Sequence, residues 1–392
     1  MIKNLSHSKN ALLYLLSIAM IFAFSAWMSL LNNFVVEVAK FDGSQVGILQ
    51  SIREIPGFLS FGVIFLLIFI PQQRLAYIST LALGIGVALT GYFTSSLGLY
   101  TTTFIMSVGF HYLATINQSL SLQWLDKKTS PIVLGKITAV SSFTKLLVFV
   151  LIFCMMRFYS AEYKSIYLIF GGITVVIALF SWMYFEHFKD DVVQETKIKL
   201  KKEYWLFYTL TFFAGARRQI FVVFASFLLV EKFGIHIENM VILLFVNSIL
   251  NIYLAPKIGK YIVHFGERLA LRVEYIGLII VFTSYAFVDN VYIAFALYLA
   301  DHLLFSMAIA LKTYFQKIAN PQDLASASAI SFTINHIAAV VLPFVLGFIW
   351  LNSKPLVFIL GTSIAVLSFL FSFLIPKNPK IGFETTLKSS SE

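Results

Sequence analysis

The chain has 392 residues, of which 59% are hydrophobic and 16% aromatic, while only 12% are charged. Soluble domains carry about 25% charged residues, so this composition excludes a soluble globular protein and indicates an integral membrane protein. The net charge of +10 does not indicate nucleic-acid binding, because the basic residues lie in short segments between apolar runs.

Twelve apolar segments of helix length are predicted to cross the bilayer. The first six are 11–36, 45–70, 75–96, 99–125, 132–156 and 165–185. The second six are 204–230, 237–258, 269–288, 291–315, 324–349 and 356–375. We therefore predict an all-α membrane protein with two six-helix pseudo-symmetric bundles.

The polar stretch 187–203 separates these bundles, which we place at 1–186 and 204–392. Segment 11–36 is too long for a signal peptide and lacks a cleavage pattern, so we expect a retained helix. The single cysteine, Cys154, lies in an apolar run, which excludes a disulfide framework and a thiol metal motif. No Walker loop, CxxC or GxSxG motif occurs, so we expect no enzyme, no cofactor and no resident metal.

The lysines and arginines are distributed unevenly between the two sides of the predicted membrane. With both termini cytoplasmic, nineteen lie on that side, five lie on the opposite side and five fall within the helices. The positive-inside rule therefore predicts cytoplasmic termini and a cytoplasmic linker at 187–203.

Short motifs repeat in the same order in both halves, at offsets between 189 and 194 residues. Lys40-Phe41 recurs as Lys232-Phe233, and Arg74-Leu75-Ala76 recurs as Arg268-Leu269-Ala270. His111 matches His302, and Ser142-Phe143-Thr144 matches Ser331-Phe332-Thr333. Two parallel six-helix repeats are the plan of one class of secondary transporter.

With this repeat, the whole chain resembles the major facilitator superfamily. That family carries a Gly-x-x-x-Asp-Arg/Lys-x-Gly-Arg motif after helix 2 and a weaker copy after helix 8. The first copy is degraded here to Pro71-Gln72-Gln73-Arg74, whereas the second, 259–268, keeps both glycines and the final arginine. Val263 stands in place of the acidic residue.

The resemblance implies that helices 1, 4, 7 and 10 line a central cavity, that 2, 5, 8 and 11 flank it, and that 3, 6, 9 and 12 face outward. The polar residues deep within the predicted helices lie on the lining and flanking helices. We expect no ionisable residue in the middle of the outward helices. The expected substrate-binding residues are Arg218, Arg217, His111, His302 and Asn247. The expected accessory residues of the cavity are Arg53, Lys145, Asn335 and His336.

The consecutive arginines Arg217 and Arg218 lie near the middle of segment 204–230, about 20 Å from either helix end. An arginine at that depth costs about 2.5–3.5 kcal/mol, so the pair must face a cavity, a carboxylate or an anionic ligand. Arg218 shares its helix stripe with small and polar residues, whereas Arg217 shares its stripe with bulky apolar ones. We expect Arg218 to bind a carboxylate or phosphate bidentately. The alternative is an internal ion pair with Glu54 or Asp301.

Asp301 and Glu54 are the candidate proton-coupling residues, because a carboxyl group in a cavity can be tuned to exchange protons. For Glu54, a local ion pair with Arg53 is the competing interpretation. The histidines His111, His302 and His336 could in principle bind a transition metal, but none forms an i, i+4 pair and the arginines would repel a cation.

The sequence thus predicts a secondary active transporter that moves a small anionic solute across the cytoplasmic membrane by alternating access, and proton coupling through Asp301 or Glu54 is a hypothesis. We expect a monomer in a lipid bilayer with no nucleic-acid partner. Efflux of drug-like or lipid-like amphiphiles is the main alternative. Transition-metal transport ranks below it, and a non-transporting membrane receptor ranks last.

Overall fold

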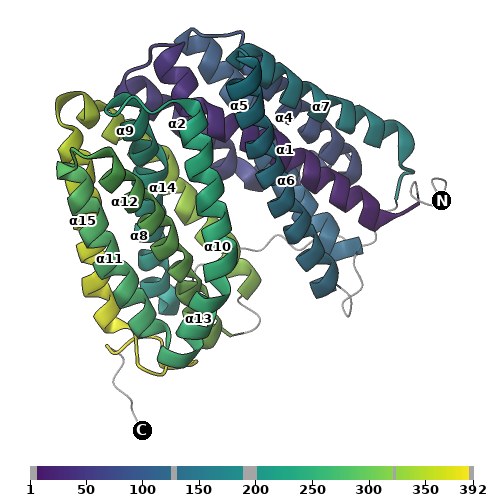
Figure 1. Cartoon of the computed structure of the whole chain (residues 1–392). Coiled ribbons are helices and arrows are strands. Elements are labelled where there is room, and N and C mark those ends of the chain that lie inside the picture. Colours follow the sequence, from purple (N-terminus) through teal and green to yellow (C-terminus); the bar gives the residue numbers. More distant parts are fainter. Residues whose placement is uncertain (1–6, 125–129, 189–200, 321–323, 388–392) are drawn as a thin grey trace. The chain divides into compact units, whose positions relative to one another are not determined.

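The computed structural model describes residues 7–124, 130–188, 201–320 and 324–387. Helices dominate this part of the chain, which contains no strand and only an isolated bridge between Lys380 and Phe383 (Figure 1). The predicted all-α class is therefore confirmed. Most of the predicted linker, 187–203, lies outside the described residues.

The helices of the first half begin and end near the bounds of the predicted apolar segments, because burial or contact with lipid stabilises their apolar side chains. They are α1 (Lys9–Glu37), α2 (Gly43–Phe58), α3 (Val63–Leu67), α4 (Gln72–Thr90), α5 (Ser96–Trp124), α6 (Ser130–Tyr159) and α7 (Tyr163–Tyr184). Ser8 caps α1 by accepting a hydrogen bond from the backbone N–H of Ala11 at 3.2 Å.

The helices of the second half also follow the predicted segments. They are α8 (Trp205–Gln219), α9 (Ser226–Glu231), α10 (Ile237–Phe265), α11 (Glu267–Phe287), α12 (Val291–Phe305), α13 (Ile309–Ile318), α14 (Leu324–Asn352) and α15 (Lys354–Phe371). Asn290 caps α12 and Ser353 caps α15, each by accepting hydrogen bonds from backbone N–H groups of the first turn.

Three predicted segments change their helical pitch along their length. Pro56 lies inside α2, and the chain tightens into a 3-10 turn at Leu59–Gly62 before α3. A π-helix, Ile220–Ala225, joins α8 to α9, and a 3-10 turn, Ser306–Ala308, joins α12 to α13. Because π-helical turns occur frequently at functional sites, the first two turns after Arg218 are of particular interest.

Nine helices in the described part of the chain are long and apolar enough to cross a membrane. Large apolar side chains remain exposed on them, for instance Val176 on α7 at 63% and Ile280 on α11 at 60%. Such exposure suits side chains that face lipid rather than water. The chain is therefore a multi-pass membrane protein.

The described contacts divide the chain into two compact units. Unit 1 comprises Met1–Phe41, Ile52–Glu195 and His236–Phe245, and unit 2 comprises Asp42–Ser51, Thr196–Ile235 and Val246–Glu392. The first turns of α2 thus group with the second half of the sequence, and the first turns of α10 group with the first half.

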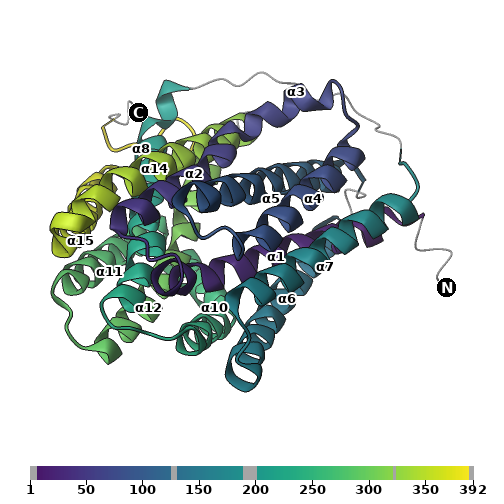
Figure 2. The same cartoon turned by 90° about the horizontal axis from the view of Figure 1, so that it is seen from above.

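Unit 1 is built around α4, which packs against α5 and α7, while α1 packs against α6 and α7 (Figure 2). Glycines permit the closest approaches. A Cβ atom on Gly171 of α7 would lie 2.3 Å from the backbone nitrogen of Ala88, and one on Gly109 of α5 would lie 2.2 Å from that of Leu83. These helices therefore pack backbone to backbone, as small residues allow in membrane bundles.

In unit 2, α8 packs against α14 and α15, and α11 packs against α15 and α12. An aromatic core lies at one end of this unit, where the rings of Phe207 and Phe315 stack at 4.1 Å between centroids. The C-terminal residues close over this core, because the Tyr314 hydroxyl donates a hydrogen bond to the Glu384 carbonyl at 2.6 Å. This packing fixes α8, which carries the arginine pair.

Candidate functional site

Arg217 is held inside unit 2 by groups from two neighbouring helices. Its guanidinium lies 3.5 Å from Glu274 Oε1 on α11 and donates a hydrogen bond to the Ser368 hydroxyl on α15. The guanidinium carbon lies 4.6 Å from the ring centroid of Tyr275, a cation–π distance. The Arg217 and Glu274 side chains are 1% and 2% exposed, so they form an internal ion pair.

A second carboxylate, Asp301 on α12, belongs to the same electrostatic cluster. It is 1% exposed and interacts electrostatically with both Arg217 and Glu274. Neither of its oxygens has a hydrogen-bond partner among the described residues, and the same holds for Glu274 Oε2. The cluster thus combines two acidic groups and one guanidinium, all three buried from solvent.

Arg218 differs from its neighbour in its surroundings. Its side chain is exposed, whereas Arg217 and Gln219 on either side are buried. It is the penultimate residue of α8, and Gln219 separates it from the π-helix Ile220–Ala225. Within four consecutive positions the chain therefore has a buried guanidinium, an exposed guanidinium and a change of helical pitch.

The same helix packs tightly against α14 one turn before Arg218. A Cβ atom on Gly215 would lie 2.5 Å from Asn335 Oδ1, so a larger residue there would have to displace that amide. Asn335 also donates a hydrogen bond from Nδ2 to the Ser331 carbonyl at 3.3 Å. His336, the next residue on α14, is buried at 9% exposure.

His302 is half-buried and surrounded by aromatic rings. Its Nδ1 lies 3.1 Å from the Tyr298 carbonyl, and its ring lies 5.0 Å from that of Phe221 in the π-helix. The Tyr298 hydroxyl accepts a hydrogen bond from Ser226 at 3.4 Å. These contacts connect α12, which carries Asp301, to the segment that follows Arg218.

Asn247 is buried in α10 and contacts Asn251 one turn later, which donates from Nδ2 to Asn247 Oδ1 at 3.0 Å. Asn251 in turn accepts a hydrogen bond from the Ser306 hydroxyl at 2.7 Å, in the 3-10 turn between α12 and α13. The two asparagines therefore lie in a polar chain within unit 2.

In unit 1, Arg53 and Glu54 are both buried and form an ion pair with each other. Arg53 also contacts the Met28 sulfur at 3.0 Å, and its carbonyl accepts a hydrogen bond from Ser107 on α5. The local pairing considered for Glu54 is thus present. His111 is half-buried on α5, and the exposed Lys145 lies 5.7 Å from the Phe149 ring centroid.

Sequence reasoning missed Glu274 and Ser368, the two partners of Arg217. We expected no ionisable residue in the middle of the outward helices, yet Glu274 lies two turns into α11 and is 1% exposed. Its signal in the sequence was a lone acidic residue inside the apolar segment 269–288. Ser368 carries no signal of its own, because serines are common in membrane helices.

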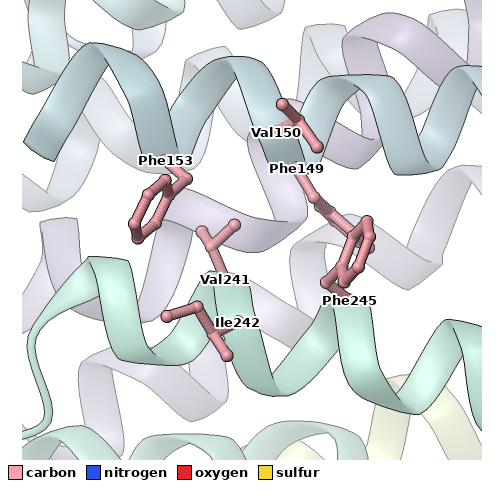
Figure 3. A pocket seen from close by; sticks show the side chains of 6 residues that line it. All are labelled: Phe149, Val150, Phe153, Val241, Ile242 and Phe245. Carbon is pink, nitrogen blue, oxygen red and sulfur yellow. The ribbon is translucent and has the colours of Figure 1, made fainter. Parts of the chain in front are cut away.

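A different kind of pocket lies between α6 and α10 in unit 1 (Figure 3). Its volume is about 160 Å³, and it is lined only by apolar side chains. These are Phe149, Val150 and Phe153 of α6 and Val241, Ile242 and Phe245 of α10. The pocket offers contact to an apolar group and no hydrogen bond.

Membrane-crossing helices that carry a few buried charges define the class of the chain as a polytopic membrane protein. The chain belongs to the Major Facilitator Superfamily, whose model matches residues 13–343. This confirms the resemblance seen in the sequence and the transporter fold. No curated protein sequence shows significant similarity to the chain.

Solved structures of this superfamily share the fold at low sequence identity. The nucleoside transporter NupG is 15% identical, covers 93% of this chain and 98% of its own, and gives a TM-score of 0.74. A bacterial homologue of the human lysosomal transporter Spinster, in an inward-facing and occupied conformation, is 11% identical. It covers 96% of this chain and 97% of its own, also with a TM-score of 0.74.

Proposed function

We propose that the protein is a proton-coupled secondary active transporter that moves a small anionic solute across the cytoplasmic membrane by alternating access. Both termini are cytoplasmic in this proposal, since that side then carries nineteen of the basic residues. The protein works as a monomer, because each chain contains both repeats.

The contrast between Arg217 and Arg218 carries the proposal. Arg217 is buried and forms an ion pair with Glu274, so its charge is neutralised inside the protein. Arg218 is exposed within a helix that the family uses to line its cavity. An exposed guanidinium at membrane depth is costly unless it faces water or an anion, so Arg218 is the substrate-recognising residue.

Guanidinium chemistry narrows the substrate class. The planar fork of arginine binds carboxylate and phosphate through two parallel hydrogen bonds, whereas a neutral solute gains much less from it. His302, His111 and Asn247 are proposed to contribute neutral hydrogen-bonding groups, and Arg53, Lys145, Asn335 and His336 to complete the polar lining. Arg217 acts on the substrate through its position next to Arg218, not by contact.

Asp301 is the proposed proton carrier. A buried carboxyl group needs either a hydrogen-bonding partner or a proton, and both oxygens of Asp301 lack a partner within the described residues. Arg217 and Glu274 interact with it, so a change in either would alter its proton affinity. Glu54 is the second candidate, although its carboxylate already pairs with Arg53.

A ligand-stabilisation screen on the purified protein tests the proposal. Carboxylates, organic phosphates, a nucleoside, divalent metals and hydrophobic cations are compared by the shift that each causes in thermal unfolding. A ligand at 100 times its Kd stabilises the folded state by about 2.7 kcal/mol. We expect a carboxylate or phosphate to stabilise the wild type, Arg218→Ala to weaken its binding by roughly 10- to 100-fold, and Arg218→Lys to weaken it less.

One observation favours a second candidate, the export of an apolar amphiphile. The pocket lined by Phe149, Phe153 and Phe245 is wholly apolar and suits an aromatic or aliphatic group. This candidate predicts stabilisation by hydrophobic cations and no effect of Arg218→Ala. The same screen therefore decides between the two candidates, and stabilisation by the nucleoside alone would refute both.

A further inference from the structure

Two arginines at the start of α11 have no acidic partner in the described part of the chain. Arg268 and Arg272 lie one turn apart on the same helix face. Glu267, the adjacent acidic residue, is already paired with Lys317 at 2.7 Å. Nε of both arginines and Nη2 of Arg272 are buried, and none has a hydrogen-bond partner among the described residues.

This arrangement is unfavourable without an anion. Like charges one turn apart repel each other, and the positive end of the helix dipole disfavours further cations in the first turns. Buried donors without acceptors add to the cost, since such groups are almost always satisfied in folded proteins. A bound anion at this position would remove all three costs.

The surroundings indicate where that anion comes from. The Arg272 guanidinium lies 4.1 Å from the ring centroid of Phe373, beside the end of α15. Leu269, Val273 and Ile276 on α11 are exposed and apolar, and α11 is one of the membrane-crossing helices. Basic groups next to lipid-facing apolar side chains at a helix end lie at the headgroup depth of a bilayer.

We infer that Arg268 and Arg272 bind the phosphate of an anionic phospholipid headgroup in the cytoplasmic leaflet. The two guanidinium groups supply donors to the phosphate oxygens, and the acyl chains lie over the exposed apolar face of α11. This inference uses the membrane fold and the proposed orientation, but it is independent of the transported solute.

The internal repeat provides a matched control. Arg74 on α4 occupies the position equivalent to Arg268, whereas Ile78 occupies the position equivalent to Arg272. The first half therefore has a single exposed arginine at this place, and it lacks the pair. A site that needs two guanidinium groups exists only in the second half.

The test measures thermal unfolding of the delipidated full-length protein in detergent. Phosphatidylglycerol, phosphatidylcholine and inorganic phosphate are each titrated into wild type, R268Q/R272Q and R74Q. We expect phosphatidylglycerol to stabilise the wild type and R74Q, and the double variant to need at least about tenfold more of this lipid. Without lipid, the double variant is expected to be at least as stable as the wild type, because the repulsion between the two arginines is removed.

An unchanged phosphatidylglycerol titration in R268Q/R272Q would overturn the inference, as would equal stabilisation by phosphatidylcholine. Equal stabilisation by inorganic phosphate would show a free-anion site instead of a lipid site. Arg272→Lys keeps the charge but removes the fork, so it is expected to weaken lipid binding even if the double variant does not fold. No transport is measured, so the result does not depend on the proposed solute.

Discussion

At the scale of single residues, Glu274 and Ser368 hold Arg217 inside unit 2, whereas its neighbour on α8 is exposed. Arginines at mid-depth are unusual enough to be noticed, and the bulky stripe through Arg217 indicated a packed environment. Leu210, Ile220 and Phe224 on that stripe are indeed fully buried. Glu274 was overlooked as a partner because pairing between helices that are distant in sequence leaves no local pattern that links the two residues.

The buried pair yields a stability prediction. Arg217→Met leaves the Glu274 carboxylate without its cation, and breaking a buried pair in this way costs about 3–5 kcal/mol. We expect a clear fall in the apparent thermal midpoint of the purified protein. The double variant Arg217→Met/Glu274→Gln should recover most of it, because no unpaired charge remains.

The control is Arg218→Met, which removes the neighbouring exposed guanidinium and should change the thermal midpoint much less. If Arg217→Met and Arg218→Met were equally stable, the internal pair would not stabilise unit 2.

At the scale of helices, hydropathy indicated the helical class because lipid contact and helix packing both select apolar residues. Nine helices of the described part are long and apolar enough to cross a membrane, and twelve crossings remain a prediction. The changes of pitch were not predictable in the same way. The break after Pro56 has a local cause in the missing N–H, but the π-helix at Ile220–Ala225 contains no proline or glycine. Its sequence therefore carries no local signal for the change of pitch.

Adjacent glycines on α7 provide a test of the helix packing. A Cβ atom on Gly171 would lie 2.3 Å from the Ala88 nitrogen, whereas one on Gly172 would meet nothing within 4 Å. Gly171→Ala must push α7 away from α4, and overpacking of this kind typically costs about 1–3 kcal/mol. We expect a lower thermal midpoint and lower yield of folded protein for Gly171→Ala.

Gly172→Ala should be neutral or slightly stabilising, because alanine favours the helix by up to about 1 kcal/mol. Equal behaviour of the two variants would contradict the close approach of α4 and α7.

At the scale of the whole molecule, the repeat in the sequence predicted the superfamily. Several short matches in the same order identify a duplication even where one copy of the family motif has lost residues. The division at 187–203 remains a prediction, and the contact-based units differ from it by exchanging Asp42–Ser51 and His236–Phe245. Such an exchange depends on contacts between segments that are distant in sequence. In the proposed function, Arg218 sets the charge of the solute, whereas no residue of the sequence sets its shape.

Uptake into proteoliposomes tests the proposed function most directly. The anion that stabilises the wild type is supplied outside vesicles with an imposed proton gradient, and uptake is normalised to the amount of reconstituted protein. We expect the wild type to accumulate the anion and Arg218→Ala to take it up at least about tenfold more slowly. Accumulation by Arg218→Ala at the wild-type rate would contradict the assignment of Arg218 as the anion-recognising residue.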